Sequence, residues 1–350
     1  MEEPLLFDIG PPTTRRIADL VKEGGVASLI EVAGLKTGGY AEQRADAATY
    51  QEVRCRSALN CVKGMRYFDW TLNPYRGCTH GCHYCYARRY HSQFELGAGD
   101  DFASVILVKT NFVEVLRREL ARGSWMRDVI GLGTATDCYQ PIEGHYKLTR
   151  RTLEALIEFR SPAGVITKGP MIVRDKSLLA KLCEIDGSSV VVSVPCSDDD
   201  VTARLEPGTA PPRQRLRAVR ELLDAGVNAG VLMSPIVPGI SSKPRLIEKT
   251  VKDAAAAGVP IVGSNVMHLQ GGTREHFTAW LSREFPHLVA GYRDLYKKDY
   301  APASYCTEVK KVVKAARTKH GPDSRDIRAA RSGSGRPADI AGSTKVRAGS

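Results

Sequence analysis

The sequence predicts an α/β fold in which parallel strands alternate with helices. From Val105 onward, short β-branched or apolar runs repeatedly precede a polar loop and then a longer helical pattern. Such alternation argues for parallel strands with right-handed crossovers, in either a barrel or an open doubly wound sheet. Two observations favour the barrel. No G-x-G-x-x-G or Walker loop follows any strand, and chemically active residues fall just after the strands, where a barrel assembles its site.

The repeats can be assigned in chain order from their hydrophobic periods. The first strand of the series is expected at 105–109, and Asn111 is a suitable cap for a helix over 112–122. Later strands are expected at 129–133, 165–168, 189–194, 229–233 and 261–268. Later helices are expected near 147–160, 176–183, 212–224, 243–257, 274–283 and 287–297, and Gly226 is a suitable end for the helix over 212–224.

The two ends of the chain differ from this repeating part. Residues 1–54 are expected to form an N-terminal extension, because residues 1–50 combine Gly pairs, Pro11-Pro12 and only short apolar runs. Residues 55–300 form the expected main domain, and 301–350 a C-terminal helix with a basic, disordered tail. Residues 307–350 hold 5 Lys, 6 Arg and 4 acids, which gives +7 of the net charge of +11. The tail is either a source of phosphate affinity or a solvated terminus.

Composition indicates a cytosolic protein. No apolar run approaches the roughly 18 residues that a membrane span needs, and the start Met1-Glu-Glu-Pro lacks the layout of a signal peptide. The 9 cysteines are an odd number. In a reducing compartment they are interpreted as metal ligands, reactive thiols or small core residues rather than as a disulfide framework.

Three cysteines carry the strongest chemical signal. Cys78, Cys82 and Cys85 follow the spacing C-x3-C-x2-C on a glycine-bearing loop, which lets three thiolates converge on one metal centre. Both iron–sulfur clusters and structural zinc sites use four protein ligands when they are closed. Three thiolates therefore indicate a site that keeps one position open for chemistry. His80 and His83 lie in the same loop and invite a zinc alternative, although solvent-facing positions are expected for both.

The loop also carries a family resemblance. The pattern C-x3-C-x-Φ-C, with Tyr84 before the last cysteine, resembles the signature of radical S-adenosylmethionine (SAM) enzymes. The longer run NPYRGCTHGCHYCYAR resembles the spore photoproduct lyase-like, or DNA repair photolyase-like, branch of that superfamily, over about residues 55–300. The resemblance implies a partial (β/α)6 TIM-type barrel, open on one side, whose strand near 65–72 delivers the cysteine loop. It also implies a [4Fe–4S] cluster on Cys78, Cys82 and Cys85, with SAM at the open iron.

The same resemblance implies roles for polar residues after the predicted strands. Thr136 and Asp137 would accept from the SAM ammonium group, and Lys168 would meet the SAM carboxylate. Ser193 would hydrogen-bond the ribose, and Tyr84 would meet the adenine. Each has a structural alternative: a turn for Thr136 and Asp137, a solvent-facing ammonium for Lys168, a satisfied strand hydroxyl for Ser193, and a core aromatic for Tyr84.

The sequence departs from the lyases at one chemically important place. They carry a hydrogen-donating cysteine immediately before a T-S-D segment, and this chain has Thr134 there. Cys138 lies four residues further on, and it can substitute as hydrogen donor only if the loop turns it inward. A buried, inert thiol is the alternative.

Two functions follow from these observations. The first is a lyase-like radical SAM enzyme, supplied by a flavodoxin- or ferredoxin-like electron donor, with damaged DNA as a substrate suggested by the resemblance alone. The second is a non-catalytic nucleic-acid-binding protein stabilised by zinc or a cluster, using the cysteine loop and the basic tail. The sequence leaves the substrate and the oligomeric state open.

Overall fold

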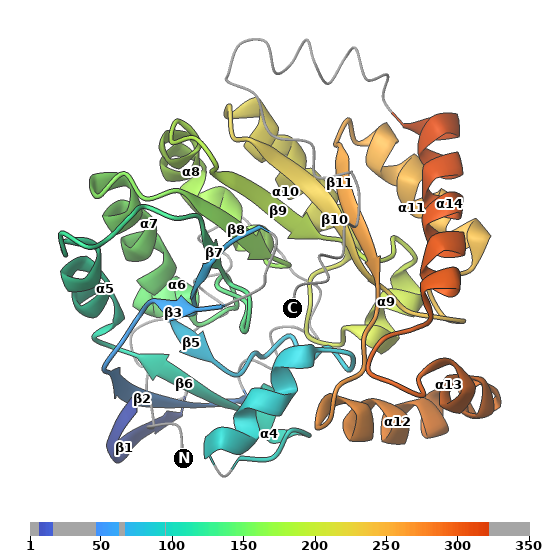
Figure 1. The fold of residues 1–350 in the computed structure, drawn as a ribbon, viewed down its shortest axis with the longest axis horizontal. Coiled ribbons are helices and arrows are strands. Elements are labelled where there is room, and N and C mark those ends of the chain that lie inside the picture. Colours follow the sequence, from blue (N-terminus) through green and yellow to red (C-terminus); the bar gives the residue numbers. More distant parts are fainter. Residues whose placement is uncertain (1–6, 17–46, 63–66, 95, 322–350) are drawn as a thin grey trace, which may run out of the picture.

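The strands that the structure describes form two sheets (Figure 1). The computed structural model describes residues 7–16, 47–62, 67–94 and 96–321. The larger sheet has the strand order β11-β10-β9-β8-β7-β4-β3. Its strands are β3 (Asn60–Cys61), β4 (Trp70–Leu72), β7 (Ile130–Leu132), β8 (Ala163–Thr167), β9 (Ser189–Ser193), β10 (Ala229–Ile236) and β11 (Ile261–Val266).

Six neighbouring strands of the larger sheet, from β4 to β11, run parallel, and only β3 is antiparallel to its neighbour. This confirms the expected α/β architecture with a six-stranded parallel sheet. Figure 1 shows helices lying around the outside of these strands. Between strands the chain forms α5 (Phe112–Leu120), α6 (Glu143–Tyr146), α7 (Leu148–Glu158), η3 (Pro170–Asp175), α8 (Lys176–Cys183), α9 (Asp199–Leu205), α10 (Pro212–Asp224) and α11 (Pro244–Ala256).

The hydrophobic pattern explains why these elements form where they do. Strands β8, β9 and β10 place Val165, Val190 and Val231 in the main apolar core, as buried parallel strands require. Helix α10 starts with proline at its first position, where no intrahelical N–H is needed, and it buries one apolar face. It ends before Gly226, whose φ of +80° suits a helix terminus. The predicted ranges 105–109, 176–183 and 212–224 coincide with β6, α8 and α10.

The smaller sheet corrects the expected position of one strand. Its order is β1-β2-β6-β5, with β1 (Phe7–Arg16), β2 (Thr49–Cys55), β6 (Val105–Lys109) and β5 (Tyr75–Arg76). Strand β6 was expected in the barrel, but it pairs with β2 in parallel and with β5 in antiparallel orientation, whereas β4 pairs directly with β7. The expected boundary between residues 54 and 55 falls inside β2. The end of the predicted extension is therefore a strand of this sheet, and residues 1–6 and 17–46 lie outside the described residues.

A C-terminal layer follows β11. It contains α12 (Thr273–Glu284), η4 (Pro286–Leu288), α13 (Val289–Leu295) and α14 (Ala303–His320). Phe277, Trp280 and Leu281 of α12 share a second apolar core with Cys82 and Tyr84 of the cysteine loop. The expected disordered tail lies almost entirely in 322–350, outside the described residues. In the part of the chain that is described, no helix is long and apolar enough to cross a membrane.

Replacing Tyr50 with alanine tests whether β2 belongs to the folded core. The Tyr50 side chain is buried in the main core. Removal of a buried aromatic ring should lower the free energy of unfolding by about 3–5 kcal/mol. The matched control is R54A on the same strand, where the side chain is exposed and the change should stay within about 0.5 kcal/mol. Urea unfolding of both variants provides the measurement, and a Y50A value as small as that of R54A would contradict the assignment.

Candidate metal and cofactor site

The three cysteines lie on the loop between β5 and η2 (Tyr86–Phe94). The loop closes on itself through two tight turns, because Gly81 N–H donates to the Cys78 carbonyl (3.1 Å) and Cys85 N–H to the Cys82 carbonyl (3.2 Å). Cys78 and Cys82 are buried, and Cys85 is half-buried. None of the 9 cysteines of the chain forms a disulfide. All three thiols are therefore available as ligands.

A buried arginine holds the loop in this shape. The Arg88 side chain is 2% exposed and donates to four backbone carbonyls. Two of them, of Gly81 (2.8 Å) and Cys82 (3.0 Å), belong to the loop itself. The other two, of Ala98 and Gly99, belong to the segment before α4 (Asp101–Ser104). The guanidinium group thus fixes the turn that carries Cys82.

The protein around the thiols disfavours the charged thiolate form. Positively charged iron would therefore have to stabilise the thiolates on binding. Burial raises the pKa of Cys82 to about 12. Burial, followed by the negative charges of Asp137 and the other two thiols, raises the pKa of Cys78 well above its ordinary value. Thiolates are the ligating form, so iron must displace these protons on binding. Among the described residues, no three His, Cys, Asp or Glu side chains are arranged around a single ion. The fit to a cluster therefore rests on the number, spacing and burial of the thiols.

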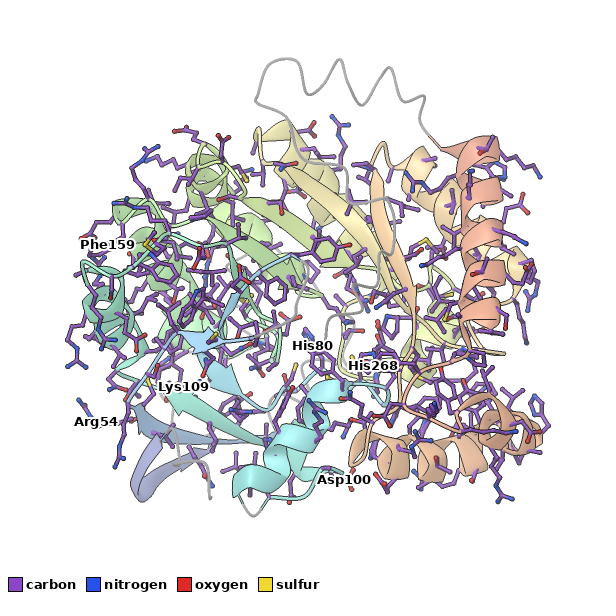
Figure 2. All side chains as sticks on the ribbon, viewed as in Figure 1. Arg54, His80, Asp100, Lys109, Phe159 and His268 are labelled. Atoms are coloured by element: carbon purple, nitrogen blue, oxygen red, sulfur yellow. The ribbon has the colours of Figure 1, made fainter. Side chains whose placement is uncertain are left out.

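Of the two histidines of the loop, His80 is buried, contrary to expectation, and His83 is half-buried. His80 is 5% exposed, lies near the middle of the molecule (Figure 2), and places Nδ1 3.3 Å from Asp137 Oδ2. His83 places Nδ1 3.0 Å from His276 Nε2 and stacks on Trp280, with ring centroids 4.8 Å apart. Both imidazoles thus connect the cysteine loop to other elements.

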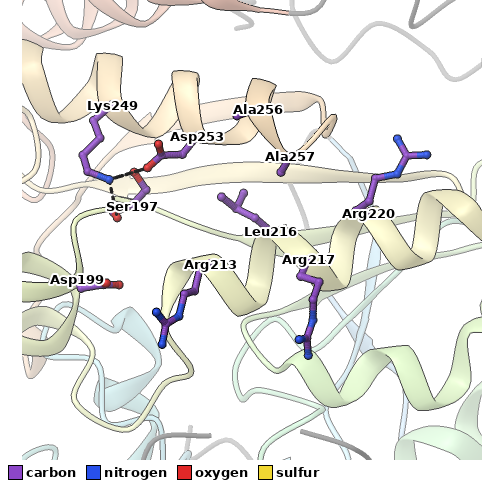
Figure 3. Close-up of a pocket in the computed structure, with 10 residues that line it drawn as sticks. All are labelled: Ser197, Asp199, Arg213, Leu216, Arg217, Arg220, Lys249, Asp253, Ala256 and Ala257. Carbon is purple, nitrogen blue, oxygen red and sulfur yellow. Dashed lines mark hydrogen bonds and ion pairs between the residues drawn. The ribbon is translucent and has the colours of Figure 1, made fainter. Parts of the chain in front are cut away.

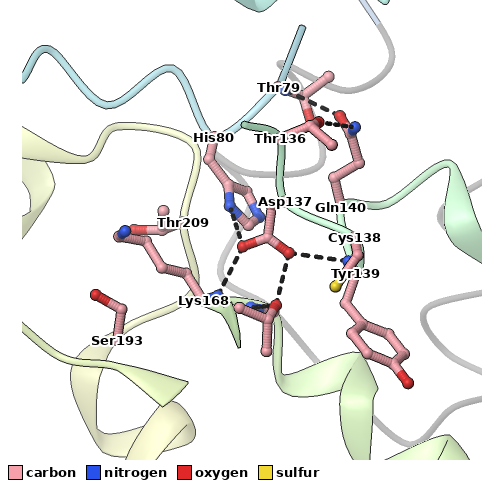
Figure 4. A network of polar contacts seen from close by, with 12 residues as sticks. Thr79, His80, Thr136, Asp137, Cys138, Tyr139, Gln140, Lys168, Ser193 and Thr209 are labelled. Carbon is pink, nitrogen blue, oxygen red and sulfur yellow. Dashed lines mark hydrogen bonds and ion pairs between the residues drawn. The ribbon is translucent and has the colours of Figure 1, made fainter. Parts of the chain in front are cut away.

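Asp137 is the centre of a polar network at the ends of β7 and β8 (Figure 4). Its Oδ1 accepts from Tyr139 N–H (2.9 Å) and from the Thr167 hydroxyl (2.6 Å), and its Oδ2 accepts from Lys168 N–H (2.6 Å). Burial alone would raise the pKa of this carboxyl, but His80, Thr167 and the Lys168 N–H outweigh it and hold the pKa well below its usual range. Asp137 is therefore ionised, and its acceptor positions are largely occupied by the protein.

Thr136 ties the same strand end to the cysteine loop. Its hydroxyl donates to the Gly77 carbonyl (2.6 Å) and accepts from Gln140 Nε2 (3.1 Å). Gln140 is completely buried, and its Oε1 accepts from Thr79 N–H (3.2 Å). The predicted residues Thr136 and Asp137 thus both contact the loop or its histidine, in a turn of the kind that was the structural alternative.

Lys168 and Tyr84 lie next to each other, beside a buried ion pair between Glu206 and Arg215. The Lys168 ammonium lies 5.7 Å from the centre of the Tyr84 ring, and the Tyr84 hydroxyl donates to Glu206. Glu206 is also paired with Arg215, with Nη2 and Oε2 2.6 Å apart and both side chains almost fully buried. Burial lowers the pKa of Lys168, but the negative charges of Cys82 and Glu206 outweigh that effect and raise it. The structure thus places Lys168 as a cation beside the cysteine loop.

Ser193 and Cys138 are more deeply engaged in the fold. The Ser193 hydroxyl donates to the Ser234 carbonyl on the next strand (2.7 Å), and no dashed contact joins it to the network in Figure 4. The Cys138 side chain is 0% exposed, and its sulfur lies 3.6 Å from the Ile166 carbonyl. These contacts favour the alternative of a buried core thiol, and the assignment of Cys138 as hydrogen donor stays a prediction.

The segment Leu205–Gly208 packs directly on the cysteine loop. His83 N–H donates to the Leu205 carbonyl (3.0 Å), and Gly208 N–H donates to the His80 carbonyl (3.0 Å). A Cβ atom at Gly208 would lie 2.2 Å from the Thr79 carbonyl oxygen, so only glycine allows this approach. Arg204 points elsewhere and pairs with Glu284.

Two supporting arginines were not identified from sequence. Arg88 is adjacent to Arg89 in the motif, and no pattern separates a buried from an accessible arginine there. Arg215 lies at a core-facing position of α10, where the helical period predicts an apolar residue. That break in the apolar pattern of the helix is the signal from which a buried arginine with a partner could have been predicted.

A separate pocket of about 540 Å³ lies between α10 and α11, on the helical side of the sheet (Figure 3). Arg213, Arg217, Arg220 and Lys249 contribute its positive charge, and Asp199 and Asp253 oppose it. None of the residues predicted for the metal and cofactor site lines this pocket.

Comparison with known proteins agrees with the motif. The model of the Radical SAM superfamily matches residues 72–246, which include the cysteine loop and the strand ends described above. An uncharacterized protein of Mycobacterium tuberculosis is 39% identical over 263 residues, covering 74% of this chain and 77% of that protein. An uncharacterized protein of Methanocaldococcus jannaschii is 26% identical over 201 residues, covering 57% of this chain and 72% of that protein.

Solved structures show the same fold. Spore photoproduct lyase complexed with dinucleoside spore photoproduct superposes with a TM-score of 0.59 at 13% identity, covering 85% of this chain and 91% of that chain. A mutant of the same enzyme with bound AdoMet and dinucleoside spore photoproduct gives a TM-score of 0.55 at 14% identity, with the same coverage. At this identity the likeness establishes the fold alone.

The Glu206–Arg215 pair can be tested with a double-mutant cycle. R215M leaves the Glu206 carboxylate buried without its cation, so the free energy of unfolding should fall by about 3–5 kcal/mol. The double variant E206Q/R215M removes both charges and should recover most of that loss. Denaturant unfolding of the two single variants and the double variant measures the coupling. Additive losses in the double variant would contradict a direct charge pair.

Proposed function

The chain belongs to the radical SAM superfamily, and on that premise we propose that it uses reductive cleavage of SAM to abstract hydrogen from an organic substrate. Its cofactors are a [4Fe–4S] cluster and SAM. When bound, the cluster supplies the electron that cleaves SAM to methionine and a 5′-deoxyadenosyl radical. The observation that carries the proposal is the loop of Cys78, Cys82 and Cys85, whose three thiols are unpaired and lie beside the polar ends of β7 and β8.

We assign the cluster to the three thiols and the SAM contacts to neighbouring side chains. Lys168 is a cation beside the loop and suits the SAM carboxylate. The Ser193 hydroxyl donates to the Ser234 carbonyl and retains acceptor capacity for a ribose hydroxyl. Tyr84 fixes the loop before Cys85 and places its ring beside Lys168, on the side proposed for the adenine.

In this proposal Thr136 and Asp137 do not bind SAM themselves, and instead hold neighbouring residues in position. The Asp137 carboxylate already accepts from three protein donors and faces His80, so a ligand ammonium group would have to displace one of them. We therefore propose both residues as positioning residues that align the end of β7 with the cysteine loop. The end of β7 beside them would hold the SAM ammonium group.

Damaged DNA is the substrate class we propose. Support comes from the fold, because spore photoproduct lyase was solved with a dinucleoside spore photoproduct, and from the positive charge of residues 307–350. We also propose hydrogen-transfer chemistry that differs from that of a lyase with a cysteine donor, because Thr134 occupies that position and Cys138 is buried. We further propose a flavodoxin- or ferredoxin-like electron donor and a cytosolic location, where the 9 free cysteines stay reduced.

SAM cleavage by the reconstituted protein tests the proposed chemistry. Anaerobically reconstituted protein with SAM and dithionite should release 5′-deoxyadenosine, measured by chromatography. The C82A variant removes one cluster ligand and should release at least 100-fold less, an order-of-magnitude expectation for the loss of an essential cofactor. The matched control is C183S, a cysteine outside the site, which should retain wild-type release.

Two outcomes separate this function from the alternatives. Protein that contains an intact iron–sulfur cluster but forms no 5′-deoxyadenosine contradicts the proposed enzyme. Elemental analysis that finds zinc without iron and sulfide supports instead the non-catalytic nucleic-acid-binding protein.

Irradiated duplex or single-stranded DNA should increase SAM cleavage relative to unirradiated DNA, and equal rates with both would remove damaged DNA as the substrate class.

A further inference from the structure

The hydroxyl of Thr79 is buried in the cysteine loop without a hydrogen-bond partner. The residue is 1% exposed, and its Oγ1 meets no donor or acceptor among the described residues. A buried hydroxyl that loses its contacts with water and gains none from protein is destabilising. Buried polar groups of this kind are rare in folded proteins and call for a specific explanation. The position of Thr79, directly after Cys78, makes the metal centre the first candidate.

The backbone around Thr79 is fixed on both sides. Its N–H donates to Gln140 Oε1 (3.2 Å), and its carbonyl oxygen faces Gly208 so closely that a Cβ there would lie 2.2 Å away. Threonine is branched at Cβ, which restricts its χ1 angle to few rotamers. The hydroxyl therefore cannot reach a distant acceptor through a small movement of the loop.

The carbonyls next to Thr79 already accept hydrogen bonds. The Gly77 carbonyl accepts from the Thr136 hydroxyl (2.6 Å) and Gln140 Nε2 (3.3 Å). The Cys78 carbonyl accepts from Gly81 N–H (3.1 Å), and the His80 carbonyl from Gly208 N–H (3.0 Å). None of these three carbonyls accepts from the Thr79 hydroxyl, and binding of the cofactor would bring sulfide acceptors to the loop that begins at the neighbouring Cys78.

We propose that the Thr79 hydroxyl donates a hydrogen bond to a sulfide of the bound [4Fe–4S] cluster and so raises the reduction potential of the cluster. This inference rests on the cofactor assigned to the three cysteines. Reduction adds one negative charge, which spreads over the sulfurs, and a donor aimed at sulfur stabilises the reduced form more than the oxidised form. Thr79 is thus a positioning and tuning residue for electron entry, with no contact to substrate.

The test compares Thr79 variants in the reconstituted, full-length protein. T79V replaces the hydroxyl with a methyl group of similar size and should make the midpoint potential of the cluster more negative than in the wild type. T79S keeps the hydroxyl and should restore a potential close to the wild-type value. Redox titration followed by electron paramagnetic resonance gives the potential, and iron and sulfide content verify equal loading. Should T79V not retain the cluster, T79A provides the same comparison with a smaller side chain.

A remote threonine provides the control for a purely structural role. The Thr250 hydroxyl is buried, donates to the Leu246 carbonyl (2.8 Å) and accepts from Ser197 N–H (2.9 Å). T250V should lower the melting temperature and leave the cluster potential unchanged, whereas T79V should shift the potential with a smaller change in melting temperature. A fully loaded T79V protein with the wild-type potential overturns the inference. A wild-type protein that binds no iron–sulfur cluster removes the proposed function as well, so the two failures can be distinguished.

Discussion

The geometry of the site depends on one buried cation, the guanidinium group of Arg88. A charged side chain at 2% exposure is costly unless its hydrogen-bonding groups are satisfied, and Arg88 meets that condition with four backbone carbonyls. Two carbonyls come from the turn that carries Cys82 and two from the segment before α4. The rigid fork of the guanidinium suits this arrangement in a way that the single ammonium of lysine does not. The loop therefore presents its thiols in a shape set by protein contacts.

Around this loop, buried carboxylates fasten the ends of successive strands. Asp137, after β7, accepts from Thr167 and Lys168 at the end of β8 and faces His80 of the loop. Glu206, beyond β9, joins Tyr84 of the loop to Arg215 of α10. Through these contacts both carboxylates hold the loop against the sheet. Helix α12 closes the remaining side, since Trp280 stacks on His83 and the Thr273 hydroxyl donates to the Cys85 carbonyl (2.9 Å).

Sequence patterns identified the features that are local and missed those that depend on pairing. The Val- and Ile-rich runs located the strands, and the cysteine spacing singled out the loop of the candidate site, because both signals lie within a few residues. Periodicity does not reveal the neighbour of a strand, so β6 was placed in the larger sheet although it pairs with β2. The short strand β2 had no turn signal to separate it from the residues before it. The sequence also did not reveal the roles of Arg88 and Asp137. The hydrogen bonds of a buried charged group come from carbonyls, hydroxyls and N–H groups of distant segments.

The central claim is that three thiolates hold a cluster with one iron open to SAM, and magnetic resonance tests it most directly. The reduced, reconstituted protein can be measured by electron–nuclear double resonance with SAM carrying ¹⁵N in its amino group. The account predicts a hyperfine coupling from that nitrogen, which requires direct ligation of the amino group to iron, and it predicts loss of the cluster signal in C82A. A cluster spectrum unchanged by SAM, with no nitrogen coupling, would show that the fourth iron is not open to this ligand and would contradict the account.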